Sequence, residues 1–168
     1  RLSLTDYAEV IFSHHRLKEQ KAAFLYIDLD RFKSVNDAFG HHIGDQLLIQ
    51  MANRLHQKLG QNQKLFRIGG DEFVLISEHT DANEAIELAE KVLHAIQESY
   101  SIANKEINIS ASLGIAIYPE HGTNLQDLLI NADVAMLASK EQGRNTFTVF
   151  HSTTDQQDVR SQSKLIND

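Results

Sequence analysis

Two adjacent glycines, Gly69 and Gly70, separate two runs of β-prone residues near the middle of this 168-residue chain. The runs are residues 64–68 and 73–76. A glycine pair between such runs predicts a tight β-hairpin, because glycine adopts positive φ without steric cost. The strands of a hairpin are antiparallel, so the sequence argues against an all-parallel sheet. The bare backbone of the turn also allows a ligand to approach closely.

Two acidic residues, Asp71 and Glu72, follow the turn directly. Acidic residues at a hairpin tip often serve solubility alone, and this stretch by itself does not decide between solubility and function. A second stretch favours function. Residues 22–30 form an apolar run typical of a buried strand, and this run ends in Asp28 and Asp30. A carboxylate at the end of a buried strand is costly unless it is paired or bound to a metal.

The side chains of Asp28, Asp71 and Glu72 converge if the apolar strand lies beside the hairpin. Like charges that are crowded in this way require a cation, and ligands that are all oxygen suit Mg²⁺ or Mn²⁺. Asp71 and Glu72 are successive residues of an extended chain, so their side chains point to opposite faces. We therefore do not expect these two residues to do the same job.

The composition is that of one compact domain. A chain of 168 residues suits a single domain, and 42% hydrophobic residues suffice for a sizeable core. The absence of cysteine excludes a disulfide framework and a thiolate metal site. A net charge of −7 without a basic stripe argues against nucleic-acid binding. Without a transmembrane run or a signal peptide, we expect a cytoplasmic segment that makes no membrane contact, although the full-length protein can be membrane-anchored elsewhere.

Hydrophobic periodicity predicts the remaining elements. Helices are expected over residues 4–19, 31–40, 41–60 and 81–98, and from a cap at Thr123 or Asn124 to Gly143. After the first helix, the predicted order is β-α-α-β-β-α-β-α-β. We therefore predict an α+β fold with a mainly antiparallel central sheet and helices on its faces.

Two of the predicted elements carry specific burial patterns. In the helix over residues 81–98, the expected inward positions are Ala85, Ile86, Ala89, Val92, Leu93 and Ile96. Between residues 107 and 113, apolar residues alternate with polar ones, which is typical of a half-buried strand. The last strand is expected near residues 147–150.

Residues 69–73 resemble the signature motif of the GGDEF family of diguanylate cyclases. Four further blocks are similar to motifs of this family and follow in its order, at residues 28–45, 112–116, 132–136 and 140–145. Five ordered blocks are far more specific than one pentapeptide. The resemblance implies a palm-like nucleotidyl cyclase fold, with a GGDEF domain over residues 1–150 and a polar tail or linker over residues 151–168.

The resemblance implies a diguanylate cyclase that condenses two GTP molecules into cyclic di-GMP and releases two pyrophosphates. In each step a ribose 3′-hydroxyl attacks an α-phosphate. Two Mg²⁺ or Mn²⁺ ions per active site are implied, and the expected metal ligands are Asp28, the Leu29 carbonyl, Asp71 and Glu72. Asp71 and Glu72 are the expected catalytic residues, and by analogy with the family Asp71 takes the proton.

By the same resemblance, the expected substrate contacts are Phe32, Lys33, Asn36, His41, Asp45, Gly70, Lys140 and Arg144. A carboxylate at Asp45 can accept from guanine N1 and N2 together, and adenine lacks this donor pair. Backbone N–H groups at Phe32 and Lys33, where a helix begins, are available to phosphate. Lys140 and Arg144 are four residues apart, so they share a helical face if the helix continues to Arg144.

Three questions stay open at this point. The family motif that precedes the first helix is either cut off before Arg1 or divergent. Residues 151–168 are either a helical linker into an EAL phosphodiesterase domain or a disordered tail. The activity is either that of a cyclase or that of a catalytically silent GTP-binding regulatory domain, which controls an attached EAL domain or a partner. A product made from two GTP molecules also implies a homodimer, driven by domains outside this segment.

Overall fold

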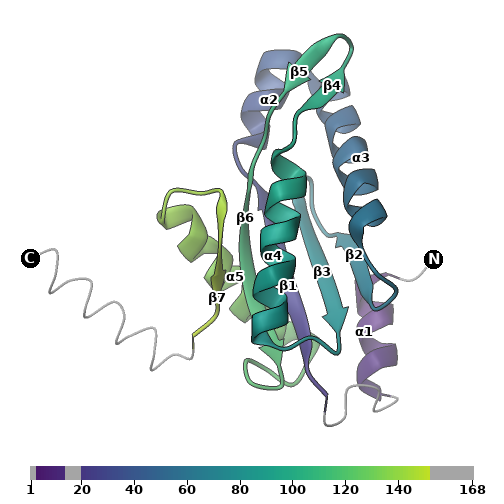
Figure 1. The fold of residues 1–168 in the computed structure, drawn as a ribbon, viewed down its shortest axis with the longest axis vertical. Helices are drawn as coiled ribbons and strands as arrows, with labels where there is room; N and C mark the ends of the chain where they lie inside the picture. Colours follow the sequence, from purple (N-terminus) through teal and green to yellow (C-terminus); the bar gives the residue numbers. More distant parts are fainter. Residues whose placement is uncertain (1–2, 14–19, 152–168) are drawn as a thin grey trace, which may run out of the picture.

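The computed structural model describes residues 3–13 and 20–151 (Figure 1). The helices are α1 (Leu4–Ser13), α2 (Phe32–Phe39), α3 (His41–Lys58), α4 (Ala82–Gln97) and α5 (Leu125–Glu141). The strands are β1 (Ala22–Leu29), β2 (Gln63–Arg67), β3 (Glu72–Glu78), β4 (Tyr100–Ile102), β5 (Lys105–Ile107), β6 (Ala111–Tyr118) and β7 (Thr146–Val149). Outside the described residues lie Arg1, residues 14–19 of the predicted first helix, and the tail from residue 152 onward.

A five-stranded sheet in the order β2-β3-β1-β6-β7 forms the centre of the domain. The pairs β2–β3, β3–β1 and β1–β6 are antiparallel, and only β6–β7 is parallel. This arrangement confirms the predicted α+β fold with its mainly antiparallel sheet. It also places β1, the apolar run that ends in acidic residues, between β3 and β6 in the middle of the sheet.

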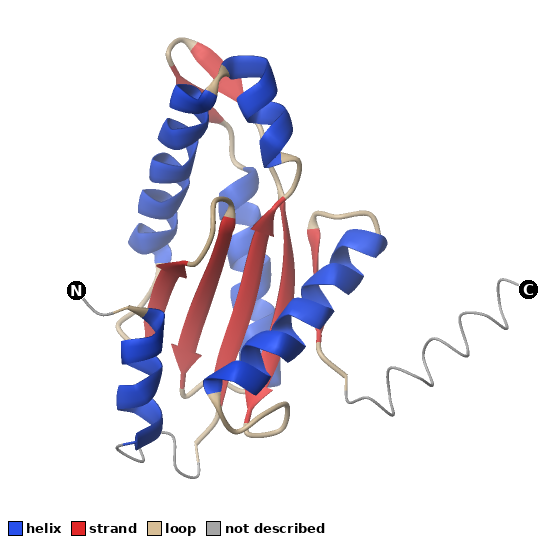
Figure 2. Ribbon diagram, turned by 180° about the vertical axis from the view of Figure 1, so that it is seen from behind, coloured by secondary structure: helices blue, strands red, loops and turns tan. Residues whose placement is uncertain are grey.

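Helices cover both faces of the sheet. Figure 1 shows α4 in front of the sheet with α3 beside it, and Figure 2, from behind, shows α5 and α1 on the opposite face. Residues of β1 alternate between the two resulting cores. Leu25 and Ile27 face the core of α3 and α4, whereas Phe24 and Tyr26 face α1 and α5. By the same alternation Asp28 lies on the face of α5.

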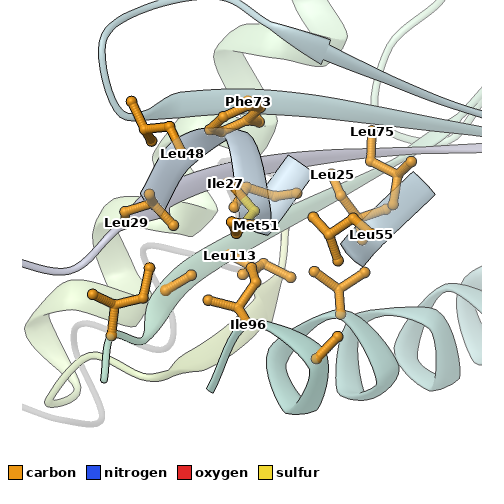
Figure 3. Packing of buried hydrophobic residues seen from close by; sticks show 14 of the residues in the cluster. Leu25, Ile27, Leu29, Leu48, Met51, Leu55, Phe73, Leu75, Ile96 and Leu113 are labelled. Atoms are coloured by element: carbon orange, nitrogen blue, oxygen red, sulfur yellow. The ribbon is translucent and has the colours of Figure 1, made fainter. Parts of the chain in front are cut away.

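The larger core lies between the sheet and the helices α3 and α4 (Figure 3). Leu25, Leu47, Met51 and Leu75 are fully buried there. Each such side chain contributes about 1.5–3 kcal/mol relative to an exposed position. This packing fixes the end of β1 and the start of α3 relative to each other, and both carry predicted site residues.

Side chains cap the N-termini of two helices. The side chain of Asp81 caps α4 by accepting a hydrogen bond from Glu84 N–H, and the Glu84 side chain accepts one from Asp81 N–H, which is a capping box. Asn124, not Thr123, caps α5 through Asp127 N–H at 2.9 Å. The open choice between the two caps is therefore resolved in favour of Asn124.

The strand expected over residues 107–113 is wrong in its bounds and in its burial. Residues 100–107 form a separate two-stranded hairpin, β4–β5, whose turn residues Ala103 and Asn104 both have positive φ. β6 begins only at Ala111, and all its residues except Tyr118 are buried. An internal strand that is covered on both faces shows no alternation, so periodicity understates its burial.

The helical faces also differ in part from the prediction. In α4, Leu88 and Ala95 are buried, whereas Ile86 and Leu93 lie at the margin of the buried stripe. In α1, the buried residues are Tyr7, Ala8 and Ile11. Within the described residues, no helix combines the length and the apolar character needed to cross a membrane.

Candidate active site

The predicted hairpin between β2 and β3 is present. The backbone N–H groups of Ile68 and Gly69 both donate to the carbonyl of Glu72, at 3.0 and 3.3 Å, and thereby close the turn. The guanidinium of Arg67 donates to the carbonyls of Gly69 and Gly70, at 3.0 and 2.8 Å. Backbone hydrogen bonds and the Arg67 side chain therefore both hold the turn from which Asp71 and Glu72 follow.

The reason given for the two glycines was wrong, because neither of them has positive φ. The described glycines with positive φ are Gly40, Gly122 and Gly143. The advantage at Gly69 is space, since a Cβ there would lie 3.3 Å from Glu72 Oε1. At Gly70 a Cβ would meet nothing within 4 Å, so this position faces open space.

The end of β1 lies beside the hairpin tip, as predicted. Asp28 is the register partner of Glu72 across the β1–β3 pair, and Leu29 N–H donates to the carbonyl of Asp71 at 3.1 Å. The structure therefore brings Asp28, Leu29, Asp71 and Glu72 together. Their roles as metal ligands stay predictions.

Asp28 is buried, with 7% of its surface exposed. Its Oδ2 lies 2.7 Å from the Nζ atom of Lys140 on α5, whereas its Oδ1 is buried and has no hydrogen-bond partner. Burial raises the pKa of Asp28, and the hydrogen bond from Lys140 opposes this shift. The nearby charges of Asp71 and Glu72 raise the pKa of Asp28 further. The contact with Lys140 therefore does not fully offset the cost of burying the Asp28 carboxylate. A further cation beside Oδ1 would lower that cost.

Glu72 is held by a tyrosine of the neighbouring strand. The hydroxyl of Tyr26 donates to Glu72 Oε1 at 3.1 Å. The pKa of Tyr26 is raised, mainly by burial and then by the charge of Glu72. Asp133 on α5 contributes to this shift, and burial also raises the pKa of Asp133 itself.

Asp30 lies beyond the end of β1 and is already satisfied by the protein. Its carboxylate accepts hydrogen bonds from the hydroxyls of Ser110 and Ser112, both at 2.6 Å, and from Asn145 N–H at 3.0 Å. Asp30 is 4% exposed. These three bonds tie the end of β1 to β6 and to the segment after α5, so Asp30 serves as an anchor.

The predicted guanine contacts lie around the junction of α2 and α3. Asn36 on α2 packs against Gly44 on α3, where an added Cβ would lie only 1.8 Å from Asn36 Oδ1. That Oδ1 atom is buried and has no hydrogen-bond partner. His41 and Asp45 are exposed in the first turns of α3. The junction therefore offers one unsatisfied amide oxygen and two accessible side chains.

The two predicted phosphate contacts at the start of α2, Phe32 and Lys33, differ in exposure. The side chain of Phe32 is buried, and its ring lies against Gly44. Lys33 is exposed. A contact between Phe32 and a nucleotide can therefore come only from its backbone, as the prediction for this segment assumed.

The condition for a shared helical face of Lys140 and Arg144 is not met, because α5 does not continue to Arg144. The helix ends at Glu141, and Gly143, Arg144 and Asn145 all have positive φ. Arg144 N–H turns back to the carbonyl of Ser139 at 3.1 Å. Lys140 and Arg144 consequently do not share a helical face, because the chain must turn to bring Asn145 to Asp30. Arg144 is exposed, and its contact with substrate stays a prediction.

Two residues of this region were missed by the sequence analysis. Tyr26 lies two positions before Asp28 and therefore on the same face of β1. Asp133 lies seven positions before Lys140 and therefore on the same side of α5. Both spacings were visible in the sequence, but only the register of β1 against β3 shows that Tyr26 reaches Glu72.

The carboxylates do not form a complete metal cage. In residues 3–13 and 20–151, no group of three or more His, Asp or Glu side chains is arranged to hold a metal ion. The carboxylates also do not line the groove of about 960 Å³ that lies between α1, the end of α3 and β2. The candidate site is therefore recognised by the groups that it brings together. These are the oxygen atoms of the carboxylates, the ammonium group of Lys140 and the open backbone at Gly70.

A protein-family model described as "Diguanylate cyclase, GGDEF domain" matches residues 1–146. The whole chain is 42% identical to the bifunctional diguanylate cyclase/cyclic di-GMP phosphodiesterase MucR of Pseudomonas aeruginosa. Over 150 residues, 89% of the chain, it is 39% identical to the cyclic di-GMP phosphodiesterase PdeR of Escherichia coli. The chain spans only 24% of the first relative's length and 22% of the second's.

The fold is similar to solved structures of the same kind. The crystal structure of the GGDEF domain of TpbB, also called YfiN, from Pseudomonas aeruginosa matches with a TM-score of 0.81 and 30% identity. The match covers 86% of this chain and 91% of that one. The family model, the relatives and the fold agree, and the chain belongs to the GGDEF family of diguanylate cyclase domains.

Proposed function

We propose that this domain is an active diguanylate cyclase, which condenses two GTP molecules into cyclic di-GMP and two pyrophosphates. The observation that carries the proposal is the state of Asp28. It is a buried carboxylate with one oxygen on Lys140 and the other without a partner. It lies directly opposite Glu72 and beside the hairpin tip. Such a group calls for a cation, as a nucleotidyl transfer site requires.

The donor set fits Mg²⁺ or Mn²⁺. Mg²⁺ is commonly bound through one or two protein carboxylates together with substrate phosphates, so a complete protein cage is not required. Asp28, the Leu29 carbonyl, Asp71 and Glu72 would hold two ions per active site. When bound, these ions would neutralise phosphate charge and lower the pKa of the attacking hydroxyl.

The protein residues orient the nucleotide in this proposal. Asn36, His41 and Asp45 would bind the guanine, because an amide and a carboxylate complement its N1, N2 and O6 edge. Backbone N–H groups at Phe32 and Lys33, and the open backbone at Gly70, would receive the phosphates.

Two basic side chains and one carboxylate complete the proposed machinery. Lys140, which neutralises Asp28 in the structure, would add charge near the phosphates, and Arg144 would join it from the turn after α5. Asp71 would take the proton of the attacking 3′-hydroxyl.

The assembly follows from the product. Cyclic di-GMP has two-fold symmetry, so two copies of the domain would face each other, each with one GTP. We further propose that residues 1–150 form the cyclase unit, that residues 151–168 lead towards an EAL domain, and that the unit acts in the cytoplasm.

A second function is supported by the name of one relative. PdeR is named a cyclic di-GMP phosphodiesterase alone, although this chain matches it over 150 residues. A GGDEF domain in this chain could likewise bind GTP without turning it over and control an attached phosphodiesterase. That protein would keep the guanine contacts but would release no pyrophosphate.

The test is product formation by the wild-type domain and by the Asp71→Asn variant, with GTP and Mg²⁺, analysed by chromatography. We expect cyclic di-GMP from the wild type. The variant should lose most of this activity while its circular dichroism spectrum is unchanged, because even the loss of a residue that supports a metal ligand costs about 10- to 100-fold. Equal product from both proteins would refute the role of Asp71. GTP binding by the wild type without any product would favour the regulatory function.

A further inference from the structure

Glu72 has the longest side chain among the three carboxylates proposed as metal ligands. Its side chain is half-buried at the first position of β3, where the hairpin ends. A glutamate has three rotatable side-chain torsions, so its carboxylate needs outside contacts to stay in one place. Within the described residues, the Glu72 carboxylate accepts a side-chain hydrogen bond from the Tyr26 hydroxyl.

The sheet register places Tyr26 correctly for this contact. Asp28 is the register partner of Glu72, and Tyr26 is the partner of Val74. Tyr26 is therefore the diagonal neighbour of Glu72, at a separation that an aromatic side chain can bridge. The ring of Tyr26 packs against the apolar cluster under α5, so the hydroxyl is presented from a fixed base.

Gly69 lies close to the same carboxylate. A Cβ at Gly69 would lie 3.3 Å from Glu72 Oε1, the oxygen that accepts from Tyr26. A side chain at residue 69 would therefore crowd this oxygen. Oε1 accepts from a donor on β1 and lies near the bare backbone of the turn.

We propose that Tyr26 is a positioning residue of the active site, which orients the Glu72 carboxylate towards the cation that it shares with Asp28. This inference rests on the proposed function, because it assumes that Glu72 receives a divalent cation. Tyr26 touches neither substrate nor metal in this account. Its hydroxyl donates a hydrogen bond to Oε1, and this bond holds the carboxylate in one orientation beside Asp28.

The decisive variant is Tyr26→Phe, which removes only the hydroxyl. A matched control is Tyr118→Phe. Tyr118 lies on β6 at the far end of the same sheet face, packs on the same apolar cluster, and its hydroxyl makes no hydrogen bond within the described residues. Both variants delete one oxygen from a half-buried tyrosine, so a general packing effect would appear in both.

The readout is Mn²⁺ binding in the presence of a non-hydrolysable GTP analogue, followed by electron paramagnetic resonance of free Mn²⁺. We expect Tyr26→Phe to weaken Mn²⁺ binding by about 10- to 100-fold, which is the usual effect of losing a group that supports a metal ligand. Tyr118→Phe should bind Mn²⁺ as the wild type does. The melting temperature without metal should stay unchanged in both variants. In a protein that makes product, Tyr26→Phe should lower kcat more than it raises KM for GTP.

Wild-type Mn²⁺ affinity in Tyr26→Phe would overturn the inference, and so would an equal loss in Tyr118→Phe. A failure of the proposed function looks different. If the wild type binds Mn²⁺ with the GTP analogue but makes no cyclic di-GMP from GTP, the cyclase proposal fails, while the difference between the two variants still decides the role of Tyr26. A wild type that binds no Mn²⁺ under these conditions would overturn both.

Discussion

At the scale of single residues, the pair of Asp28 and Lys140 sets the electrostatics of the site. The Asp28 and Lys140 side chains are 10% and 27% exposed, so water screens them only in part. Burial raises the pKa of Asp28, and Lys140 is the contact that opposes this shift. Removal of Lys140 would leave a buried carboxylate with both oxygens unpaired.

We expect Lys140→Met to destabilise the domain in a pH-dependent way. A raised pKa means that the folded protein holds the Asp28 proton more tightly than the unfolded chain, whose pKa is near the ordinary value of 3.8 for an aspartate. The contribution of this group to stability therefore falls as pH rises from that value through the folded pKa. Lys140→Met should raise the folded pKa further, so the variant loses most stability where Asp28 is charged.

Urea unfolding of both proteins at about pH 7 and about pH 4 measures this effect. The difference between variant and wild type should be about 1–3 kcal/mol at the higher pH and smaller at the lower one. Lys105→Met, on β5 and exposed, is the control and should show no such dependence. A difference that is the same at both pH values would contradict the role of Lys140 as the partner of Asp28.

At the scale of elements, the close approach of α2 and α3 shapes the proposed guanine site. Gly44 is buried in α3, and Asn36 Oδ1 occupies the space that a side chain at residue 44 would need. Alanine in a helix interior is ordinarily better than glycine by about 1 kcal/mol. The intrinsic preference of the helix and the position of Asn36 therefore oppose each other at this residue.

We expect Gly44→Ala to weaken binding of a GTP analogue because it displaces the Asn36 amide, even though alanine favours the helix. Calorimetric titration of the wild type, Gly44→Ala, Asn36→Ala and the double variant forms a double-mutant cycle. Gly44→Ala should cost affinity in the wild-type background and little more in the Asn36→Ala background. If Gly44→Ala costs the same affinity for the GTP analogue in both backgrounds, residue 44 acts independently of Asn36.

Short sequence patterns correctly predicted those elements whose position depends on neighbouring residues alone. The hairpin at residues 69–70, the strand over residues 22–29 and the end of α2 at Gly40 follow from short-range preferences, and all three are present. The three-residue strands β4 and β5 were missed because so short a stretch carries no measurable periodicity.

Long-range contacts account for the differences within the site. The chain turns at Arg144 because Asn145 N–H binds Asp30, a residue 115 positions earlier. The contact between Tyr26 and Glu72 joins residues 46 positions apart and requires the register of β1 against β3. The residue types at the site could thus be predicted from the sequence, whereas their partners depend on how the strands align.

At the scale of the whole molecule, the proposed reaction requires more than one copy of the domain. A single site would hold one GTP, whereas the product contains two nucleotides. The large apolar side chains that are exposed in the described residues belong to several elements, namely Phe39 on α2, Ile49 on α3, Ile68 after β2, and Ile130 and Leu137 on α5. We therefore expect the isolated domain to be a monomer at low concentration, and to be a slow enzyme that depends on encounters between copies.

The most direct test is the initial rate of cyclic di-GMP formation per molecule, measured over a roughly hundred-fold span of protein concentration. A second series would use the domain fused behind a parallel coiled coil, which raises the effective concentration of the partner to roughly the millimolar range. We predict product in both series, a specific rate that rises with concentration for the isolated domain, and a higher, flatter rate for the fusion. No product in either series, with GTP still bound, would contradict the assignment of this chain as an active diguanylate cyclase.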